Sequence, residues 1–174
     1  RLEASGAVAG LCPITEANLG DGIFDGVNYL AARGRIAIGT DSNVRLSVAE
    51  ELRQLEYSQR LRDRARNRLV RPGGSTGRRI YDAALAGGAQ ALGRKLGRIE
   101  AGARADFVVL DTDHPALVGR QGDFWLDGWI FAGGNSVVRE TWVGGKRLVA
   151  DGRHAKRDAA RRRFRATVER LVAA

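Results

Sequence analysis

The sequence predicts an α/β fold followed by a β-rich portion. Two short apolar runs, at residues 6–12 and 36–39, enclose a helical pattern, and a long amphipathic stretch follows the second run. Strand, helix and strand within about 35 residues are typical of a parallel βαβ unit, whose strands are buried on both faces and therefore continuously apolar. A hairpin pattern at residues 137–149 indicates the β-rich portion.

The α/β portion begins with a strand at residues 6–12, GAVAGLC, which the following proline ends. We expect a loop of turn-forming residues next, PITEANLGDGIF. Residues 25–33 predict a short helix, with Gly34 as its C-terminal stop. The second strand, at residues 36–39, runs directly into Asp41, at the strand end where parallel α/β folds place functional groups.

Two helices are expected after this strand. Ser47 and Glu50 match the capping box, in which a serine hydroxyl and a glutamate carboxylate satisfy the first free N–H groups of a helix. The amphipathic pattern continues to the turn before Pro72. One side of it carries Val48, Leu52, Leu55, Gln59 and Arg62, with Leu61 and Leu69 nearby. Thr76 is expected to cap the next helix, whose face of small residues, including Gly87, suits close packing.

The β-rich portion is expected to begin near Gly97. Residues 107–110 predict a strand, and residues 137–149 predict two strands joined by a turn at Gly144-Gly145. The expected division of the chain is residues 1–97 for the α/β portion, 98–155 for the β-rich portion with an aromatic connecting segment, and 156–174 for a basic C-terminal helix.

The composition is that of a soluble globular protein. The 174 residues are 44% apolar and 28% charged. No apolar run approaches the roughly 20 residues that a membrane span needs, so no membrane partner is predicted. The single cysteine, Cys12, excludes an intrachain disulfide and favours a reducing compartment, so a cytoplasmic location is expected.

The net charge of +9 is concentrated at one end of the chain. Residues 153–174 carry +6, whereas the first 152 residues carry only +3. Phe164, Val168 and Leu171 lie at helical spacing in this basic segment, which predicts a helix that packs by one side and exposes its basic side. A basic segment without stacking aromatics or a known module is weak support for nucleic-acid binding, so no nucleic-acid partner is predicted.

Asp41 is the main candidate for chemistry. A carboxylate at a strand end can ligate a metal ion or exchange a proton with a bound water. The alternative is that Asp41 accepts backbone N–H groups in a strand-to-helix turn, as aspartate often does. The sequence leaves both interpretations open.

Partners for a metal at Asp41 are not evident in the sequence. A catalytic zinc usually has three protein ligands, but His114 and His154 lie in neither H-x-H nor H-x-x-x-H spacing. We expect both histidines to be exposed loop residues and Cys12 to be a small buried residue at a strand end. The expected loop after the first strand offers further polar groups for a ligand, although an ordinary surface loop explains them equally: Glu16, Asn18 and Asp21.

Several stretches resemble enzymes of the amidohydrolase superfamily. GRIEAGARADFVVLD and VRETWVGGKRLVADGRH resemble the two ends of their small β-domain. IAIGTDSN resembles the eighth strand of their barrel, whose terminal aspartate lies at the metal. GLCPITEANLGDGIF and EELRQLEYSQRLRDRARNRL are more specific, and together they resemble the formimidoylglutamate deiminases within that superfamily.

This resemblance implies a zinc-dependent hydrolase. The implied fold is the C-terminal part of a (β/α)8 barrel, about strands 7 and 8 with the helices that follow, joined to part of a small β-sandwich. The implied reaction converts N-formimino-L-glutamate, a small-molecule substrate, to N-formyl-L-glutamate and ammonia in histidine degradation, in an enzyme that forms a homodimer when complete. Asp41 is the implied zinc ligand and catalytic proton acceptor.

The sequence departs from the family pattern in one large respect. The first six barrel strands and all the histidine ligands have no counterpart here, so we expect a C-terminal portion that binds zinc weakly and is inactive alone. We also expect exposed apolar surface on the α/β portion, because two parallel strands cannot close a barrel.

Two other functions stay open from the sequence. One is a different amidohydrolase deaminase that acts on a nucleobase-like substrate. The other is a non-catalytic interaction module whose basic terminal helix binds an acidic partner. No arginine is assigned to the substrate's carboxylates, because a solvent-facing position before the helix cap explains Arg45 better than a binding role.

Overall fold

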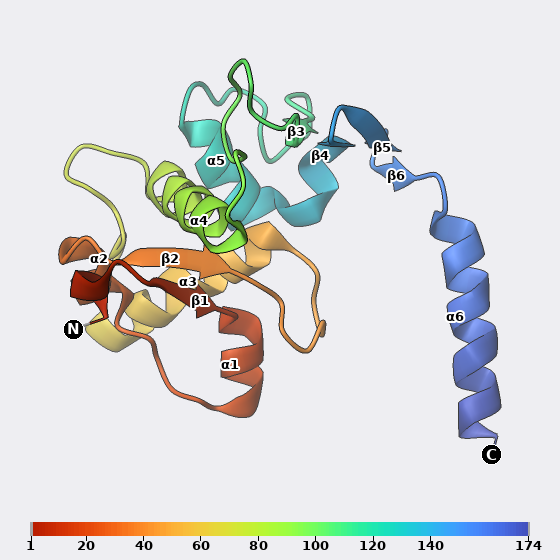
Figure 1. Cartoon of the computed structure of the whole chain (residues 1–174), viewed down its shortest axis with the longest axis horizontal. Coiled ribbons are helices and arrows are strands. Elements are labelled where there is room, and N and C mark those ends of the chain that lie inside the picture. Colours follow the sequence, from red (N-terminus) through yellow and green to blue (C-terminus); the bar gives the residue numbers. More distant parts are fainter. Residues whose placement is uncertain (1, 174) are drawn as a thin grey trace.

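Two parallel strands form the first sheet of the molecule (Figure 1). In the computed structural model, which describes residues 2–173, β1 (Val8–Leu11) pairs in parallel with β2 (Arg35–Ile38). A 3₁₀ turn precedes them and two helices connect them: Glu3–Ser5, α1 (Pro13–Leu19) and α2 (Gly26–Ala31). The predicted parallel βαβ unit is therefore confirmed.

The first part of the segment after β1 is a helix, so the predicted loop is wrong for residues 13–19 and confirmed for residues 20–24. Pro13 is the first residue of α1, a position where proline loses no hydrogen bond and its fixed φ suits a helix. The Cys12 N–H donates to Glu16 Oε1 at 2.7 Å, which satisfies one of the N-terminal donors. Gly20, at φ 76°, ends the helix in the left-handed conformation. The residues of this segment that suggest turns also suit the two ends of a short helix.

The end of α2 uses Gly34 for a reason that the sequence did not indicate. The left-handed residue after the helix is Arg33, at φ 61°, not the glycine. A Cβ at position 34 would lie 2.4 Å from the ring of Tyr29. Gly34 is therefore required by the close approach of the Tyr29 ring to the backbone.

The helix α3 (Val48–Asp63) begins as predicted but ends earlier. Ser47 caps it by accepting the N–H of Glu50 at 3.3 Å. The carboxylate of Glu50 does not accept the Ser47 N–H, as a capping box would require, but binds the guanidinium of Arg45 at 2.5 and 2.6 Å. The predicted continuation toward Pro72 is wrong. Two apolar residues on or near the amphipathic side, Val48 and Leu61, are exposed.

The early end of α3 has a physical cause in Glu56. This fully buried carboxylate accepts the N–H groups of Arg68 and Leu69, both at 2.9 Å, and pairs with Arg60 at 2.6 Å. The segment after the helix therefore folds back along α3 instead of continuing it. Leu69 is buried, as expected, but it reaches the core from this returning segment.

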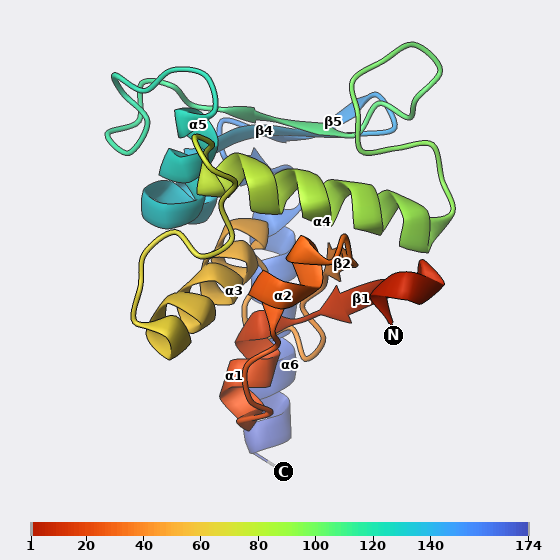
Figure 2. The ribbon, with the colours of Figure 1, turned by 90° about the vertical axis from the view of Figure 1, so that its left-hand side faces the viewer.

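The helix α4 (Thr76–Leu92) lies across the parallel strands (Figure 2). Ser75 is its cap, accepting the N–H of Arg78 at 3.0 Å, so the expected cap at Thr76 is displaced by one residue. The predicted small-residue face is confirmed, because Gly87 lies directly on β2. A Cβ at Gly87 would lie 1.8 Å from the carbonyl oxygen of Ile36.

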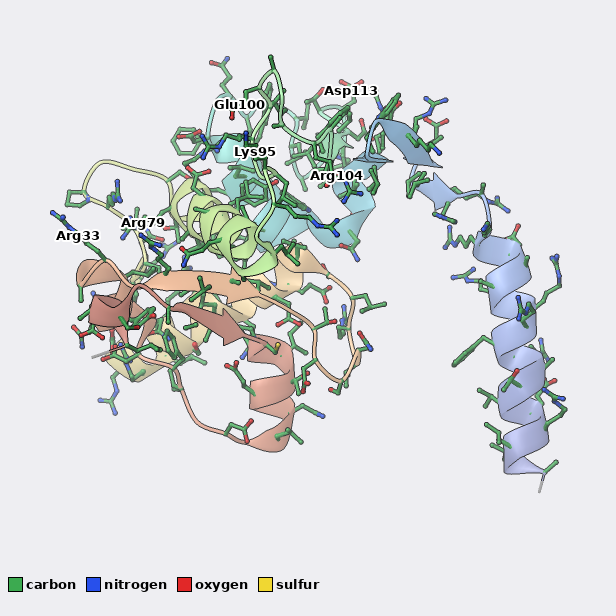
Figure 3. The ribbon with its side chains drawn as sticks, viewed as in Figure 1. Arg33, Arg79, Lys95, Glu100, Arg104 and Asp113 are labelled. Atoms are coloured by element: carbon green, nitrogen blue, oxygen red, sulfur yellow. The ribbon has the colours of Figure 1, made fainter. Side chains whose placement is uncertain are left out.

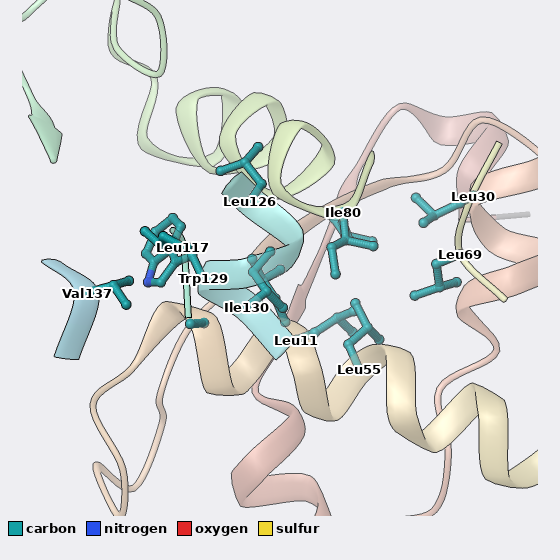
Figure 4. Packing of buried hydrophobic residues seen from close by; sticks show 13 residues of the cluster. Leu11, Leu30, Leu55, Leu69, Ile80, Leu117, Leu126, Trp129, Ile130 and Val137 are labelled. Carbon is teal, nitrogen blue, oxygen red and sulfur yellow. The ribbon is translucent and has the colours of Figure 1, made fainter. Parts of the chain in front are cut away.

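The core lies between α3, α4 and the aromatic segment that directly precedes the second strand of the last sheet (Figure 4). That segment forms a short helix, a π-helical turn and a 3₁₀ turn: α5 (Phe124–Gly128), Trp129–Gly133 and Gly134–Val137. Its Ile130 and Val137 are fully buried, together with Leu52 of α3 and Ile80 of α4. The α/β portion and the aromatic segment therefore share one apolar core.

The second sheet is antiparallel, in the order β3-β4-β5-β6. Its strands are β3 (Phe107–Leu110), β4 (Val138–Val143), β5 (Lys146–Ala150) and β6 (Arg153–His154). Gly144 and Gly145, at φ 56° and 76°, form the turn between β4 and β5, as two-residue hairpins require. The predicted hairpin is confirmed. The division of the chain into three parts stays a prediction.

The last helix, α6 (Arg157–Val172), extends away from the rest of the chain (Figure 1). None of its described residues is buried, and Phe164 and Leu171 are each 72% exposed. The predicted helix is confirmed, whereas its predicted packing by one side is wrong for this chain. Within residues 2–173, no helix has the length and apolarity needed to cross a membrane.

Candidate functional site

The segments after β1 and β2 meet at the carboxyl ends of the two parallel strands. The strands run in the same direction, and the Gly39 N–H donates to the Leu11 carbonyl at 2.9 Å just beyond the paired residues. Cys12 follows β1, and its sulfur would lie 3.2 Å from a Cβ at Gly39. We call Cys12, Thr15, Thr40, Asp41 and Ser42 the strand-end site.

Asp41 projects from a tight turn at these strand ends. Its backbone is left-handed, at φ 45°, and the Asn43 N–H donates to the Thr40 carbonyl at 3.1 Å to close the turn. The side chains of Thr40 and Asn43 also hydrogen-bond, at 2.9 Å. The exposed Asp41 carboxylate makes no hydrogen bond or ion pair with any residue from 2 to 173. The turn is therefore closed by its neighbours, and the carboxylate stays free for a ligand.

Thr15 joins the two loops of the strand-end site. Its side chain is 3% exposed, and its hydroxyl donates to the Thr40 carbonyl at 3.0 Å. The same oxygen lies 2.9 Å from the Ser42 hydroxyl, within hydrogen-bond distance. Further along, the Asn135 amide donates to the Leu46 carbonyl at 2.9 Å, which ties this loop to the aromatic segment. Sequence reasoning missed Thr15, because its partners are distant in the chain.

Carboxylates surround the thiol of Cys12. Burial raises the pKa of Cys12, and the nearby charges of Asp41, Glu51 and Glu16 raise it further. A thiol whose pKa is raised above its ordinary value stays protonated at neutral pH and is a poor nucleophile. The half-buried Cys12 therefore fits the expected packing role at a strand end.

Glu51 lies behind the strand-end site and was not predicted. Its side chain is 1% exposed, one carboxylate oxygen accepts the Ile14 N–H of α1 at 2.9 Å, and the other oxygen has no hydrogen-bond partner in the described chain. Burial is the main cause that raises the pKa of Glu51. Its spacing of four residues from buried Leu55 is the sequence signal that could have placed it on the inner side of α3.

Replacing Glu51 by glutamine should change how stability depends on pH. A carboxyl group whose pKa is higher in the folded chain destabilises the fold as pH rises from about 4 through the raised value. Glutamine can still accept the Ile14 N–H but does not titrate. Urea unfolding at a series of pH values should show the variant gaining stability relative to the parent as pH rises.

Glu140→Gln is the matched control with the opposite slope. Hydrogen bonds from Trp142, then Arg147, lower the pKa of Glu140, so its ionisation stabilises the fold. That variant should lose stability relative to the parent as pH rises. A pH-independent difference between Glu51→Gln and the parent would contradict the account of Glu51.

The other predicted candidates lie outside the strand-end site or have local partners. Glu16 binds the backbone at the start of its own helix, whereas Asn18 and Asp21 are exposed. His114 Nδ1 accepts the Ala116 N–H at 3.1 Å, and His154 Nδ1 accepts the Lys156 N–H at 3.0 Å. Only Asp41 therefore combines a free carboxylate with a strand-end position. Glu16 lies near enough for its charge, like that of Asp41, to act on the Cys12 thiol, but its carboxylate accepts the N–H of Cys12.

A hollow among the described residues lies elsewhere. It has a volume of about 600 Å³ and lies between the C-terminal end of α4 and the following loop, with Lys95 and Glu100 in its lining (Figure 3). Its lining contains no residue of the strand-end site. The hollow therefore does not extend the candidate site.

The fit of the strand-end site to a metal ion is partial. A free carboxylate is a suitable zinc ligand, and Asp41 presents one. Residues 2–173 contain no group of three or more histidine, cysteine, aspartate or glutamate side chains that could hold a metal ion. The described chain therefore supplies one ligand of the three that a catalytic zinc usually takes from protein.

Comparison with known proteins identifies the family. The sequence pattern described as "Amidohydrolase family" matches residues 1–148. The chain belongs to the amidohydrolase family. Its mixture of helices and sheets agrees with that family, and the assignment of β1 and β2 to barrel strands 7 and 8 stays a prediction.

Three relatives illustrate the similarity of this amidohydrolase chain. It is 58% identical over 164 residues to the formimidoylglutamate deiminase of Pseudomonas aeruginosa, covering 94% of this chain and 36% of that protein. A solved amidohydrolase from Brucella melitensis is 49% identical with a TM-score of 0.89, covering 98% of this chain and 38% of that chain. A zinc-bound adenosine deaminase from Xanthomonas campestris shares the fold, at 24% identity, a TM-score of 0.84 and coverage of 99% and 39%. The amidohydrolase chain thus spans a little over a third of each relative.

Proposed function

We propose that this chain contributes to a zinc-dependent deiminase that hydrolyses N-formimino-L-glutamate to N-formyl-L-glutamate and ammonia. The 58% identity to a formimidoylglutamate deiminase over 94% of the chain is the observation that carries this proposal. The free carboxylate of Asp41 at the end of β2 supports it, because that is where the active-site groups of parallel α/β enzymes lie.

Asp41 has two roles in the proposed reaction. When bound, zinc would lower the pKa of a water molecule toward 7 and polarise the substrate. One oxygen of Asp41 would hold the ion, and the carboxylate would accept a proton as the water oxygen bonds to the formimino carbon. Transfer of protons to the terminal nitrogen then allows the C–N bond to break, so that ammonia leaves and the formyl group remains.

The remaining zinc ligands are proposed to come from another part of a longer polypeptide. The chain spans 36% of the Pseudomonas relative, and residues 2–173 do not assemble a metal cluster of their own. We therefore propose that residues 1–174 alone bind zinc weakly and turn over no substrate. Homodimer formation is proposed on the family resemblance alone, and a cytoplasmic location on the single cysteine.

An ammonia-release assay tests the proposed substrate. The complete, zinc-loaded polypeptide that contains residues 1–174 would be given formiminoglutamate. Adenosine, guanine and cytosine would be tested separately as alternative substrates for deamination. Formiminoglutamate should give the highest kcat/KM by at least about 10³-fold, the margin that specific polar recognition provides. Faster release from a nucleobase or nucleoside would replace the proposal with the alternative deaminase.

A further inference from the structure

We propose that Thr15 is a positioning residue that fixes the direction of the Asp41 carboxylate. This inference rests on the proposed function, in which Asp41 is a zinc ligand. In this inference a single hydroxyl group of α1 holds the loop that carries Asp41, which is 26 positions after Thr15 in the chain.

The Thr15 hydroxyl binds both neighbours of Asp41. It donates to the carbonyl of Thr40, on one side, at 3.0 Å and lies 2.9 Å from the hydroxyl of Ser42, on the other. The first bond holds the peptide unit between Thr40 and Asp41, and the second holds the Ser42 side chain. Together with the bonds between Thr40 and Asn43 within the turn, they fix the backbone that carries the Asp41 side chain.

The backbone of Asp41 needs such support. Its φ of 45° is left-handed, a region that costs a non-glycine residue roughly 1 kcal/mol or more, even though aspartate tolerates it better than most. Hydrogen bonds of about 1 kcal/mol each can offset that cost. Without the Thr15 hydroxyl, the loop can relax toward an ordinary conformation, which would turn the carboxylate away.

Thr15 itself is held rigidly. Thr15 is 3% exposed and β-branched, so a helix leaves it two main χ1 rotamers, and the hydrogen bonds at 3.0 and 2.9 Å favour the one observed. The preceding residue, Ile14, donates its N–H to buried Glu51 of α3, at 2.9 Å. The support therefore runs from α3 through the first turn of α1 to the Asp41 loop, with a hydrogen bond at each end and the Ile14–Thr15 peptide between them.

Removing the hydroxyl while keeping the shape tests this inference. In the complete zinc-loaded enzyme, Thr15→Val should weaken zinc binding 10–100-fold, measured by competition with a chelator, as loss of groups that orient metal ligands does. The value of kcat should fall by a similar factor with little change in KM. Thr15→Ser, which keeps the hydroxyl, should stay within about threefold of the parent in both measurements.

Thr76→Val is the matched control, because Thr76 is equally buried, at 5% exposed, but lies at the start of α4. It should leave zinc affinity and kcat unchanged. Ser42→Ala removes only one of the two hydrogen bonds, so it should weaken zinc binding by a smaller factor. It also tests the inference if Thr15→Val does not fold.

The outcomes separate this inference from the proposed function. Parent-like zinc affinity in folded Thr15→Val would overturn the positioning role. Parent-like affinity in Ser42→Ala would do so if the valine variant is unfolded. Retention of zinc and activity by Asp41→Asn would instead overturn the proposed function. If Asp41→Asn loses zinc and Thr15→Val retains it, the proposed function stands and only the positioning role of Thr15 is overturned.

Discussion

Replacing Asp41 by asparagine in the complete enzyme should lower kcat/KM by at least about 10³-fold, because the substitution removes the carboxylate proposed as both metal ligand and proton acceptor. Loss of groups that merely orient a ligand already lowers activity 10–100-fold, so loss of the ligand itself should exceed that range. Asparagine keeps the size of the side chain, and Asp41 makes no hydrogen bond or ion pair within residues 2–173, so the fold should be unaffected.

Asp21→Asn is the matched control for this experiment. Asp21 is also exposed and follows α1, but it lies outside the strand-end site. Its replacement should leave zinc content and ammonia release unchanged. Measurement of bound zinc by metal analysis and of ammonia release, in both variants, would decide the role of Asp41. Full zinc content with full activity in Asp41→Asn would remove the basis for the proposed mechanism.

Replacing Gly87 by alanine should destabilise the protein strongly, by about 3 kcal/mol or more, as overpacking of a rigid contact does. The new Cβ would lie 1.8 Å from the carbonyl oxygen and 2.6 Å from the carbonyl carbon of Ile36, both backbone atoms that cannot rotate away. Either α4 or β2 must move. Because β2 leads directly to Asp41, activity should fall together with the melting temperature.

Gly88→Ala should have the opposite effect. A Cβ on this adjacent glycine would have no atom of residues 2–173 within 4 Å, so alanine meets open space there. Alanine is favoured over glycine within a helix by about 1 kcal/mol, and the free energy of unfolding should rise by up to that amount. Urea unfolding of the two variants side by side would test the pair. Equal stability of both would show that α4 does not approach β2 as closely as the structure has it.

The regular elements were predictable where the sequence signal is local. The paired strands β1 and β2 were visible as short apolar runs, and Gly144-Gly145 marked the hairpin because only a few residues adopt its turn geometry. Helix α1 was missed, since its proline and polar residues suit a loop and a short helix equally. Local preference alone does not separate these two structures.

The end of α3 could not be predicted from periodicity. It is decided by Glu56, whose buried carboxylate binds two N–H groups 12 and 13 residues away in sequence. In the candidate site, too, some residues are indicated by local sequence and others only by long-range contacts. Asp41 could be proposed as a site residue from its place after a strand, whereas Thr15 and Glu51 are placed by contacts between residues 25 to 37 positions apart. Such contacts exist only once the chain is folded.

The exposed position of α6 has a thermodynamic consequence. An isolated helix of this length, 16 residues, is only marginally populated in water, because propagation barely outweighs the unfavourable nucleation step. With no buried side chain among its described residues, α6 draws no support from packing beyond a few pairs such as Arg165 and Glu169. Its helix–coil equilibrium is therefore set by its own sequence, and any surface that covers its apolar side would order the segment as it binds.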